Sequence, residues 1–252
     1  MNNQKPTISV ITVVYNAVDL LEGTIQSVLN QSYPHIEYVI VDGASKDGTL
    51  DLIKQYQDRI HTWVSEPDKG LYDAMNKGLS LATGDYVWFV NAGDQITGPE
   101  MVEKMIAHWT PQTDVLFGEV MIVDENRQPV GTRSERTVQK LPEKLDWKSL
   151  QRGMVVSHQG FLPRRAICGP YLLDNWTADI DWVINCLKKA KVTTHTHLVI
   201  AEFLEGGVST QKHRAFMLDR YKVLQKHYGF LPNLFAHAAI VWRAFWWKLR
   251  GN

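Results

Sequence analysis

The sequence predicts an α/β fold in which a mainly parallel β-sheet is flanked by helices. Apolar runs rich in β-branched residues alternate with segments of helical spacing, in the order β-α-β-α-β-α-β over residues 8–90. These runs are continuously apolar, which is typical of strands that are buried on both faces of a parallel sheet. Together the two observations favour a sheet with helices on both sides.

Each element of the first half follows from a local pattern. Strands are expected at residues 8–14, 38–41, 60–64 and 86–90, and helices at residues 18–31, 50–56 and 71–82. The first helix is assigned from Leu21, Ile25 and Val28, which recur at helical spacing. Gly84 is expected to close the third helix, because glycine commonly ends helices.

The second half is less regular. A hairpin is expected over residues 120–132 with its turn near Asn126, followed by a helix at 179–190, a strand at 192–200 and a loop at 205–209. Two helices finish the chain, at residues 213–227 and 233–249. Without an internal repeat or a linker, the sequence predicts one domain over residues 1–210, in halves of about 1–95 and 96–210, and a helical extension over 211–252.

Composition limits the partners. The 252-residue chain is 44% hydrophobic and 21% charged with a formal net charge of zero, so we expect a globular protein that binds no nucleic acid. We find no signal peptide and no uninterrupted apolar stretch of about 20 residues. Cys168 and Cys186 form no CxxC pair, so they are expected to be buried thiols of a cytoplasmic protein.

Two common nucleotide-binding motifs are absent. A dinucleotide-binding turn needs GxGxxG after the first strand, whereas residues 15–19 read YNAVD. A P-loop needs a lysine after its last glycine, and here Thr49 follows Gly48. An NAD-dependent enzyme and a P-loop NTPase are therefore disfavoured.

Polar side chains follow all four predicted strands, at the edge where open parallel sheets bind ligands. They are Tyr15 and Asn16, Asp42, Glu66 and Asp68, and Asn91 and Asp94. Asp42 can accept hydrogen bonds from a base or a ribose, although an acidic residue is also typical of a turn. Asp94 can hold Mg²⁺ or Mn²⁺ against a diphosphate, although it can also be read as an ordinary Gly-Asp turn.

The order of these motifs resembles that of the inverting glycosyltransferases of family 2, which have the GT-A fold. The motifs are residues 9–16 (SVITVVYN), 41–49 (VDGASKDGT), 66–70 (EPDKG), 74–78 (AMNKG) and 91–94 (NAGD). Residues 66–78, 157–159 (SHQ) and 206–209 (GGVS) are similar to bacterial exopolysaccharide enzymes of the colanic acid type. The resemblance is strong over about residues 7–95.

The resemblance implies roles for individual residues. It implies that Thr12, Tyr15, Asp42 and Asp68 line a nucleotide pocket, that Asn91 and Asp94 stand at the DxD metal motif, that Asp179 is the catalytic base, and that His158 and Gln159 lie near the acceptor. It also implies a nucleotide-sugar donor, with UDP as first choice and GDP as second. Asn91 replaces the first carboxylate of the motif, and Met75 replaces an arginine common in the family, so Lys69 or Lys77 is expected to face the diphosphate.

The reaction needs a base, because an acceptor hydroxyl must lose its proton as the new bond forms. Asp179 and Asp181 are both candidates. Asp179 is preferred on the family match, and the helix dipole would favour its anion. Asp181 is kept as an acceptor-side carboxylate or as an ordinary first-turn helix residue.

Two further segments have alternative interpretations. His195 and His197 could form a metal pair, but their alternation favours a strand with both rings on one face. The segment 206–209, followed by Lys212, His213 and Arg214, could close over a diphosphate or could be a glycine-rich surface loop.

The last predicted helix is rich in tryptophan and basic residues, which is typical of a helix in a membrane interface. Its large apolar residues are Phe235, Ile240, Val241, Trp242, Phe245, Trp246, Trp247 and Leu249. The alternative is packing on the main domain or on a second subunit. We expect the protein at the inner face of the plasma membrane, where a lipid-linked acceptor would explain such a helix.

We therefore expect an enzyme that transfers a sugar from a nucleotide-sugar to an acceptor hydroxyl in surface polysaccharide synthesis, by an inverting single displacement that uses Mn²⁺ or Mg²⁺. A sugar nucleotidyltransferase is an alternative, but the glycine-rich loop with a basic finger that such enzymes carry after the first strand is missing. A non-catalytic module that binds nucleotide-sugars is a second alternative, because Asn91 replaces a carboxylate.

Overall fold

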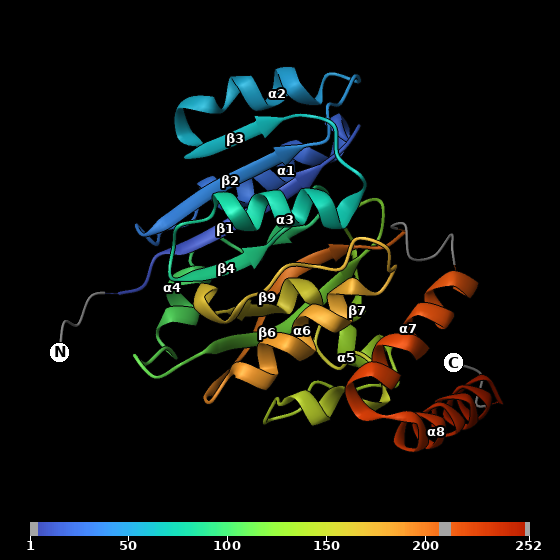
Figure 1. Cartoon of the computed structure of the whole chain (residues 1–252). Coiled ribbons are helices and arrows are strands. Elements are labelled where there is room, and N and C mark those ends of the chain that lie inside the picture. The colour runs from blue at the N-terminus through green and yellow to red at the C-terminus, as the bar shows by residue number, and fades with distance from the viewer. Residues whose placement is uncertain (1–4, 207–212, 250–252) are drawn as a thin grey trace.

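The first half of the chain forms a parallel four-stranded sheet in the computed structural model, which describes residues 5–206 and 213–249 (Figure 1). The strand order is β3-β2-β1-β4, with β1 (Ile8–Val14), β2 (Ile36–Asp42), β3 (Thr62–Ser65) and β4 (Tyr86–Phe89). The helices between them are α1 (Val18–Leu29), α2 (Thr49–Gln55) and α3 (Leu71–Leu81), with the 3₁₀ helix η1 (Gln57–Arg59) before β3. The predicted β-α-β-α-β-α-β order is confirmed.

The two faces of this sheet carry separate parts of the core. Ile11 and Val13 of β1 belong to the same buried cluster as Met75 of α3. Val10, which precedes Ile11, belongs to the second cluster, together with Ile25 of α1. Because successive side chains of a strand point to opposite faces, α3 covers one face and α1 the other (Figure 1). This explains why the strands read as continuous apolar runs.

The second half forms a mixed sheet around β6. The order is β5-β9-β6-β7, with β8 also paired to β6; β9 runs parallel to β6 and the other pairings are antiparallel. The strands are β5 (Gln95–Ile96), β6 (Val115–Val123), β7 (Pro129–Thr132), β8 (Phe161–Pro163) and β9 (Thr193–Leu204). The helices are α4 (Met101–Ile106), α5 (Arg133–Arg136), η2 (Trp147–Arg152), η3 (His158–Gly160), η4 (Arg165–Ile167) and α6 (Ala178–Lys189).

The hairpin expected near Asn126 is confirmed as β6 and β7. A bridge between Tyr86 of β4 and Arg164 places the two sheets side by side. The sheet is therefore parallel in the first half, as predicted, and mixed in the second.

The prediction that Gly84 closes α3 is wrong. The helix ends at Leu81, and Ala82 after it is extended, with φ −66° and ψ 132°. Gly84 instead lies against β1, where a Cβ would stand 2.6 Å from Ser9 Oγ and 2.9 Å from the Thr7 carbonyl oxygen. This glycine therefore permits close packing of backbone rather than a left-handed cap.

Two helices, α7 (His213–Tyr228) and α8 (Phe230–Leu249), follow the sheet and lie at its side (Figure 1). Val223 and Leu224 of α7 are buried in the core cluster that also contains α6. The last helix begins at Phe230 rather than at residue 233, because Pro232 is tolerated in a first turn, where its missing N–H leaves no bond unmade. Within the described residues, no helix has the length and apolarity needed to cross a membrane.

Candidate functional site

A cavity of about 1010 Å³ opens where the carboxyl end of β4 meets the second half of the chain. Residues from α3, α5, α6, β6 and β9 line it. Five of the nine residues to which the family resemblance gives roles are among them: Asn91, Asp94, His158, Gln159 and Asp179. The structure thus brings together side chains that are as many as 88 positions apart in the sequence.

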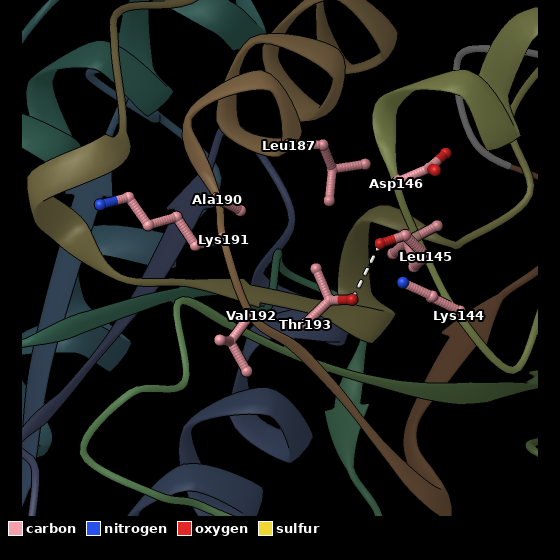
Figure 2. Close-up of a pocket in the computed structure, with 8 residues that line it drawn as sticks. All are labelled: Lys144, Leu145, Asp146, Leu187, Ala190, Lys191, Val192 and Thr193. Carbon is pink, nitrogen blue, oxygen red and sulfur yellow. Dashed lines mark hydrogen bonds between the residues drawn. The ribbon is translucent and has the colours of Figure 1, made fainter.

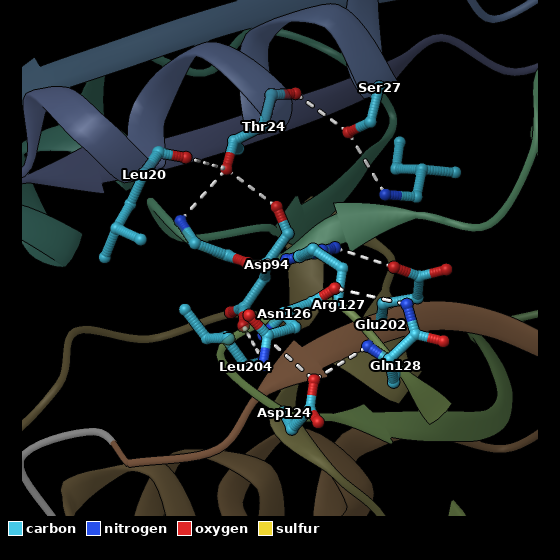
Figure 3. A network of polar contacts seen from close by, with 12 residues as sticks. Leu20, Thr24, Ser27, Asp94, Asp124, Asn126, Arg127, Gln128, Glu202 and Leu204 are labelled. Atoms are coloured by element: carbon cyan, nitrogen blue, oxygen red, sulfur yellow. Dashed lines mark hydrogen bonds and ion pairs between the residues drawn. The ribbon is translucent and has the colours of Figure 1, made fainter. Parts of the chain in front are cut away.

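The Asp94 carboxyl group is 5% exposed and is held by hydrogen bonds (Figure 3). Gln159 donates from Nε2 to Oδ2 at 2.8 Å, and the Leu204 backbone N–H donates to Oδ1 at 3.4 Å. Burial raises the pKa of Asp94 to about 7, against the opposing effects of these bonds and of the Arg127 charge. A buried carboxyl with so high a pKa would gain most from a cation beside it.

The backbone around Asp94 is held from two sides (Figure 3). Thr24 of α1 donates to the Asp94 carbonyl oxygen at 2.7 Å and accepts from the Gly93 N–H at 3.0 Å. Arg127 donates to the Gly93 carbonyl oxygen at 2.5 Å and forms a 2.6 Å ion pair with Glu202 of β9. Sequence analysis missed Thr24, Arg127 and Glu202, because no motif links them to Asp94.

Asn91 Oδ1 is a buried oxygen without a hydrogen-bond partner in the described part of the chain, and the residue lines the cavity. Leaving a buried acceptor unsatisfied costs about 1–3 kcal/mol, which a ligand would recover. Together with the Asp94 carboxylate, this amide supplies oxygen donors of the kind that Mg²⁺ and Mn²⁺ prefer. The donor set therefore fits a divalent cation that a diphosphate would also coordinate.

His158 lies between the cavity and an aromatic cluster. Its Nε2 is 2.8 Å from the Tyr171 hydroxyl, and its ring packs against Phe89 and Trp182. Burial lowers the pKa of His158 to about 4, so the ring is neutral at pH 7. The neutral ring can orient a neighbouring group by a hydrogen bond, but it cannot form an ion pair with a phosphate.

Asp179 stands in the first turn of α6 and lines the same cavity as Asp94. The Tyr72 hydroxyl donates to its Oδ1 at 3.3 Å and to the Trp176 carbonyl oxygen at 3.1 Å. Burial raises the pKa of Asp179, which makes the carboxylate a stronger base than an exposed aspartate. Tyr72 is a residue of the site that the sequence motif contained but that we had given no role.

Asp181 points away from the cavity. Residues two apart on a helix differ by about 200° in direction, and Asp181 contacts α7 instead. Its Oδ1 accepts from Lys226 Nζ at 2.9 Å and His227 Nε2 at 2.8 Å, which lower the pKa of this carboxyl. The acceptor-side role expected for Asp181 therefore has no contact to support it, and the first-turn alternative describes its position.

Three of the residues expected around the nucleotide gather at Gly43, just beyond β2. The Asp42 carboxylate is buried and accepts from the Ser45 N–H at 3.1 Å and from Ser65 Oγ at 2.5 Å. A Cβ on Gly43 would stand 2.5 Å from Asp68 Oδ2 and 3.2 Å from the Tyr15 ring. Tyr15, Asp42 and Asp68 are thus neighbours at the sheet edge, although they do not line the main cavity.

Thr12 lies deeper than the sequence motif implied. It is completely buried, and its hydroxyl donates to the Val90 carbonyl oxygen at 2.7 Å and lies 3.1 Å from the Tyr38 hydroxyl. These bonds join β1 to the segment after β4 inside the sheet. Thr12 therefore supports the strand ends and does not line the cavity.

Among the described residues, the cations that line the cavity are Lys69 and Arg133. Lys77 does not line it and forms a 2.9 Å ion pair with Glu66. The guanidinium of Arg133, on α5, donates to the carbonyl oxygens of Gln139 and Val155 at 2.8 and 2.9 Å. Sequence analysis missed Arg133, because it follows a hairpin with no recognisable motif.

The segment 206–209 was expected to close over the diphosphate, and the structure describes only its first residue. Glu205 and Gly206 line the cavity, and residues 207–212 lie outside the described part of the chain, as do the side chains of His213 and Arg214.

Comparison with known proteins agrees with this geometry. The model of the family "Glycosyl transferase family 2" matches residues 9–168. An uncharacterized glycosyltransferase of Mycobacterium tuberculosis is 31% identical over 96% of this chain and 92% of its own length. A PGL/p-HBAD biosynthesis glycosyltransferase of the same species is 30% identical over 81% of this chain and 79% of its own. TuaG of Bacillus subtilis, named for teichuronic acid biosynthesis, is 48% identical over 38% of this chain and 39% of its own.

Solved structures show the same fold at low sequence identity. TarS of S. aureus, crystallised with UDP-GlcNAc, superposes with a TM-score of 0.67 at 19% identity, over 86% of this chain. The match spans 64% of that TarS chain, so TarS is the longer protein. A mannosyltransferase of Pyrobaculum calidifontis, in complex with GDP-Man and Mn²⁺, superposes with a TM-score of 0.65 at 17% identity, over 94% of this chain and 70% of its own.

Proposed function

Because this chain belongs to glycosyl transferase family 2, we propose that its cavity binds a UDP-sugar and passes the sugar to an acceptor hydroxyl by an inverting single displacement. One observation carries the mechanism: Asp94 and Asp179 line one cavity, whereas Asp181 does not. The cavity of about 1010 Å³ is large enough for the sugar and diphosphate of the donor and part of an acceptor, with the nucleoside at the sheet edge beside it.

The nucleotide is assigned to the sheet edge at Gly43. The Asp42 carboxylate accepts hydrogen bonds from the base or the ribose, and the exposed Tyr15 ring offers a face for the base to stack on. The UDP-GlcNAc complex of TarS supports UDP, and the GDP-Man complex of the mannosyltransferase keeps GDP as second choice. Lys69 and Arg133 are the cations nearest to the cavity that can stabilise the diphosphate.

A divalent cation completes the donor site. Asp94 and Asn91 would hold Mn²⁺ or Mg²⁺, and the ion would offset the negative charge that develops on the departing diphosphate. Gln159 fixes the orientation of the Asp94 carboxylate through its 2.8 Å hydrogen bond. The Mn²⁺ bound in the mannosyltransferase complex supports this assignment.

Asp179 acts as the base. Its carboxylate takes the proton from the acceptor hydroxyl as that oxygen attacks the anomeric carbon from the side opposite the leaving diphosphate, which inverts the configuration. The Tyr72 hydroxyl donates to Oδ1 and so orients this carboxylate. The raised pKa of Asp179 brings this base closer to neutral pH, where proton transfer is most effective.

The acceptor is assigned to a lipid-linked saccharide at the cytoplasmic face of the membrane. Large apolar side chains of α8 are exposed, among them Phe230, Leu231, Leu234 and Phe235. Such a surface is typical of a helix that binds in a membrane interface. The relative named for teichuronic acid biosynthesis supports an acceptor in polysaccharide synthesis.

A screen of UDP- and GDP-sugars, with and without Mn²⁺, tests the donor. The proposal expects a UDP-sugar to raise the melting temperature, Mn²⁺ to increase that shift, and slow hydrolysis to release UDP without an acceptor. A non-catalytic binding module, which Asn91 in place of a carboxylate favours, would bind the donor but release no nucleotide. Binding of the donor without any hydrolysis or transfer would therefore overturn the enzymatic mechanism.

A further inference from the structure

Three metal-ligating side chains meet at the beginning of β9, outside the donor cavity. Glu143 Oε2 lies 3.6 Å from His195 Nδ1 and 3.9 Å from His197 Nε2. All three ligand atoms lie within 4.8 Å of one another. A tetrahedral zinc ion with bonds of about 2.0–2.1 Å needs ligand atoms about 3.3 Å apart, so small rotations would complete the site.

A bulge in β9 turns the two imidazole rings toward each other. His195 is paired with Phe117 of β6, but the next pairing joins Val199 to Glu119, so β9 carries extra residues here. His197 has a left-handed φ of 56°, and its ring centroid lies 4.1 Å from that of His195. A regular strand would place alternate rings farther apart, and bulges commonly re-aim side chains in this way.

The backbone of Gly118 makes room for this bulge. A Cβ at that position would stand 2.7 Å from Thr196 Oγ1 and 2.8 Å from the Leu198 carbonyl oxygen. The Thr196 hydroxyl also donates to the Phe117 carbonyl oxygen at 3.1 Å. The geometry that joins the two histidines is therefore built into the pairing of β6 and β9.

The loop that carries Glu143 is fixed to β9 two residues away. Thr193 Oγ1 donates to the Leu145 carbonyl oxygen at 2.8 Å, as Figure 2 shows. Leu145 is 1% exposed, so the loop is anchored by burial as well. Glu143 and His195 thus lie on two segments that are already held side by side.

His195 Nδ1 is buried and has no partner at hydrogen-bonding distance among the described residues. A buried polar atom without a partner is uncommon and costs about 1–3 kcal/mol unless a bound group satisfies it. Phe117 stacks on the ring with centroids 4.7 Å apart, which fixes its plane. The unpaired nitrogen faces the Glu143 carboxylate, where a cation would satisfy both.

This cluster is separate from the donor site. Leu204, whose N–H contacts Asp94, is nine residues farther along β9 than His195. That length of strand spans about 30 Å when extended, and the bulge shortens it only locally. An ion at the histidines would therefore not touch the diphosphate site.

We propose that Glu143, His195 and His197 bind one Zn²⁺ ion that fastens the 137–146 loop to the start of β9. Two imidazole nitrogens and one carboxylate oxygen form a known zinc ligand set, which leaves a fourth position for water. Mn²⁺ and Mg²⁺ prefer oxygen ligands, so the histidine site selects against the cation of the donor site. The ion holds segments that are about 50 residues apart in the sequence, as a structural zinc site does.

Calorimetric titration of Zn²⁺ into the metal-free full-length protein tests this site. We expect one high-affinity ion per chain and a higher melting temperature with Zn²⁺. His195→Ala and His197→Gly should each weaken zinc binding by at least about 10- to 100-fold, the loss that outer-shell partners alone can cause. His197→Gly is the sharper variant, because glycine suits the left-handed backbone at φ 56° and the metal-free protein should stay folded.

Matched controls separate this site from other ligands. His108→Ala and Glu125→Gln replace exposed residues of the same types, and Asp94→Ala removes the donor-site carboxylate; all three should bind zinc as the unchanged protein does. Cobalt(II) should give the visible absorption of a tetrahedral site, and His197→Gly should abolish it. Zinc binding of unchanged affinity in the folded His197→Gly protein, or none in the unchanged protein, would overturn the proposal.

Discussion

Burial raises the pKa of both Asp94 and Asp179, but the groups around the two carboxyls differ. Asp94 is surrounded by donors and has a pKa of about 7, so a cation stabilises its charged form. Asp179 is held at Oδ1 by the Tyr72 hydroxyl and lines the cavity. Asp181, in the same helix turn, has its pKa lowered by Lys226 and His227 and cannot take up a proton as readily.

Asp179→Asn should lower kcat by about 10²–10⁴-fold, because a positioned base contributes that much and an amide cannot accept the proton. Donor affinity, measured by calorimetry with UDP, should stay the same. Steady-state transfer assays would check the rate, and NMR of the product would check its anomeric configuration.

Asp181→Asn is the matched control for that experiment. It breaks the contacts to Lys226 and His227, so it should lower the melting temperature while kcat stays within severalfold of its original value. Near-normal transfer by Asp179→Asn, or a product with retained configuration, would contradict the assignment.

The affinity for Mn²⁺ should depend on pH through Asp94. Below the pKa of about 7 a proton competes with the cation, so the affinity measured with UDP present should fall about tenfold per pH unit and should level off above it. Asp94→Ala should bind Mn²⁺ weakly and without this pH dependence.

The metal-free protein should show the opposite trend in stability. Because the folded pKa of Asp94 is above its ordinary value of 3.8, this group stabilises the fold at low pH, and the contribution is lost as the pH rises through about 7. The loss is at most about 4 kcal/mol. The loss accumulates between the two pKa values, so calorimetric unfolding in chelator at pH 4 and pH 8, compared for the unchanged protein and Asp94→Ala, would measure it; equal pH dependence in both would refute the raised pKa.

Among the secondary-structure elements, helix α3 contains a sequence motif that allows it to pack closely against β1. Its motif AMNKG contains Gly78 in mid-helix, where glycine is unfavourable by about 0.5–1 kcal/mol relative to alanine. A Cβ there would stand 2.4 Å from Ile11 Cγ2 of β1. The glycine therefore lets α3 lie close against the central strand, which places Tyr72 and Met75 at the cavity.

Gly78→Ala should destabilise the protein although it improves helix propensity. Overpacking a filled core costs about 1–3 kcal/mol, which exceeds the propensity gain. We expect a net loss on the order of 1 kcal/mol in denaturant unfolding. Gly169→Ala is the control, because a Cβ there meets no atom within 4 Å; a stable Gly78→Ala protein would show that Ile11 moves aside easily.

At the scale of the molecule, α7 and α8 connect the catalytic part to a solvent-exposed apolar surface. Buried Val223 and Leu224 attach α7 to the core, and its Lys226 and His227 bind the Asp181 carboxylate. Asn233 and Ala236 of α8 are buried, whereas Leu231 and Phe235 are 62% and 72% exposed. Over the described side chains of α8, one face therefore packs on the protein and the other is exposed to solvent.

Leu231→Glu with Phe235→Glu should release the protein from anionic liposomes, because burying two carboxylates in the headgroup region is unfavourable. Stability and donor hydrolysis should not change, since both side chains are exposed. Leu172→Glu, at an exposed leucine elsewhere, is the control and should still co-sediment. Unchanged binding by the double variant would leave packing against another protein as the role of this face.

The sequence alone determined the parallel sheet, the order of its elements and the residues that follow its strands. Those features depend on local periodicity and on the family motifs, which act within short segments. This is why β1 to β4 and α1 to α3 were predicted close to their observed bounds. The family was likewise evident from the motifs of residues 9–94.

Only the tertiary structure decided which side chains share a site. The choice between Asp179 and Asp181 depends on the direction of each around α6, and the bond from Gln159 to Asp94 joins positions 65 residues apart. The same holds for Arg127 beside Gly93 and for Glu143 beside His195. Such contacts arise from strand register and helix packing, which local patterns do not encode, and a one-residue change of register would separate them.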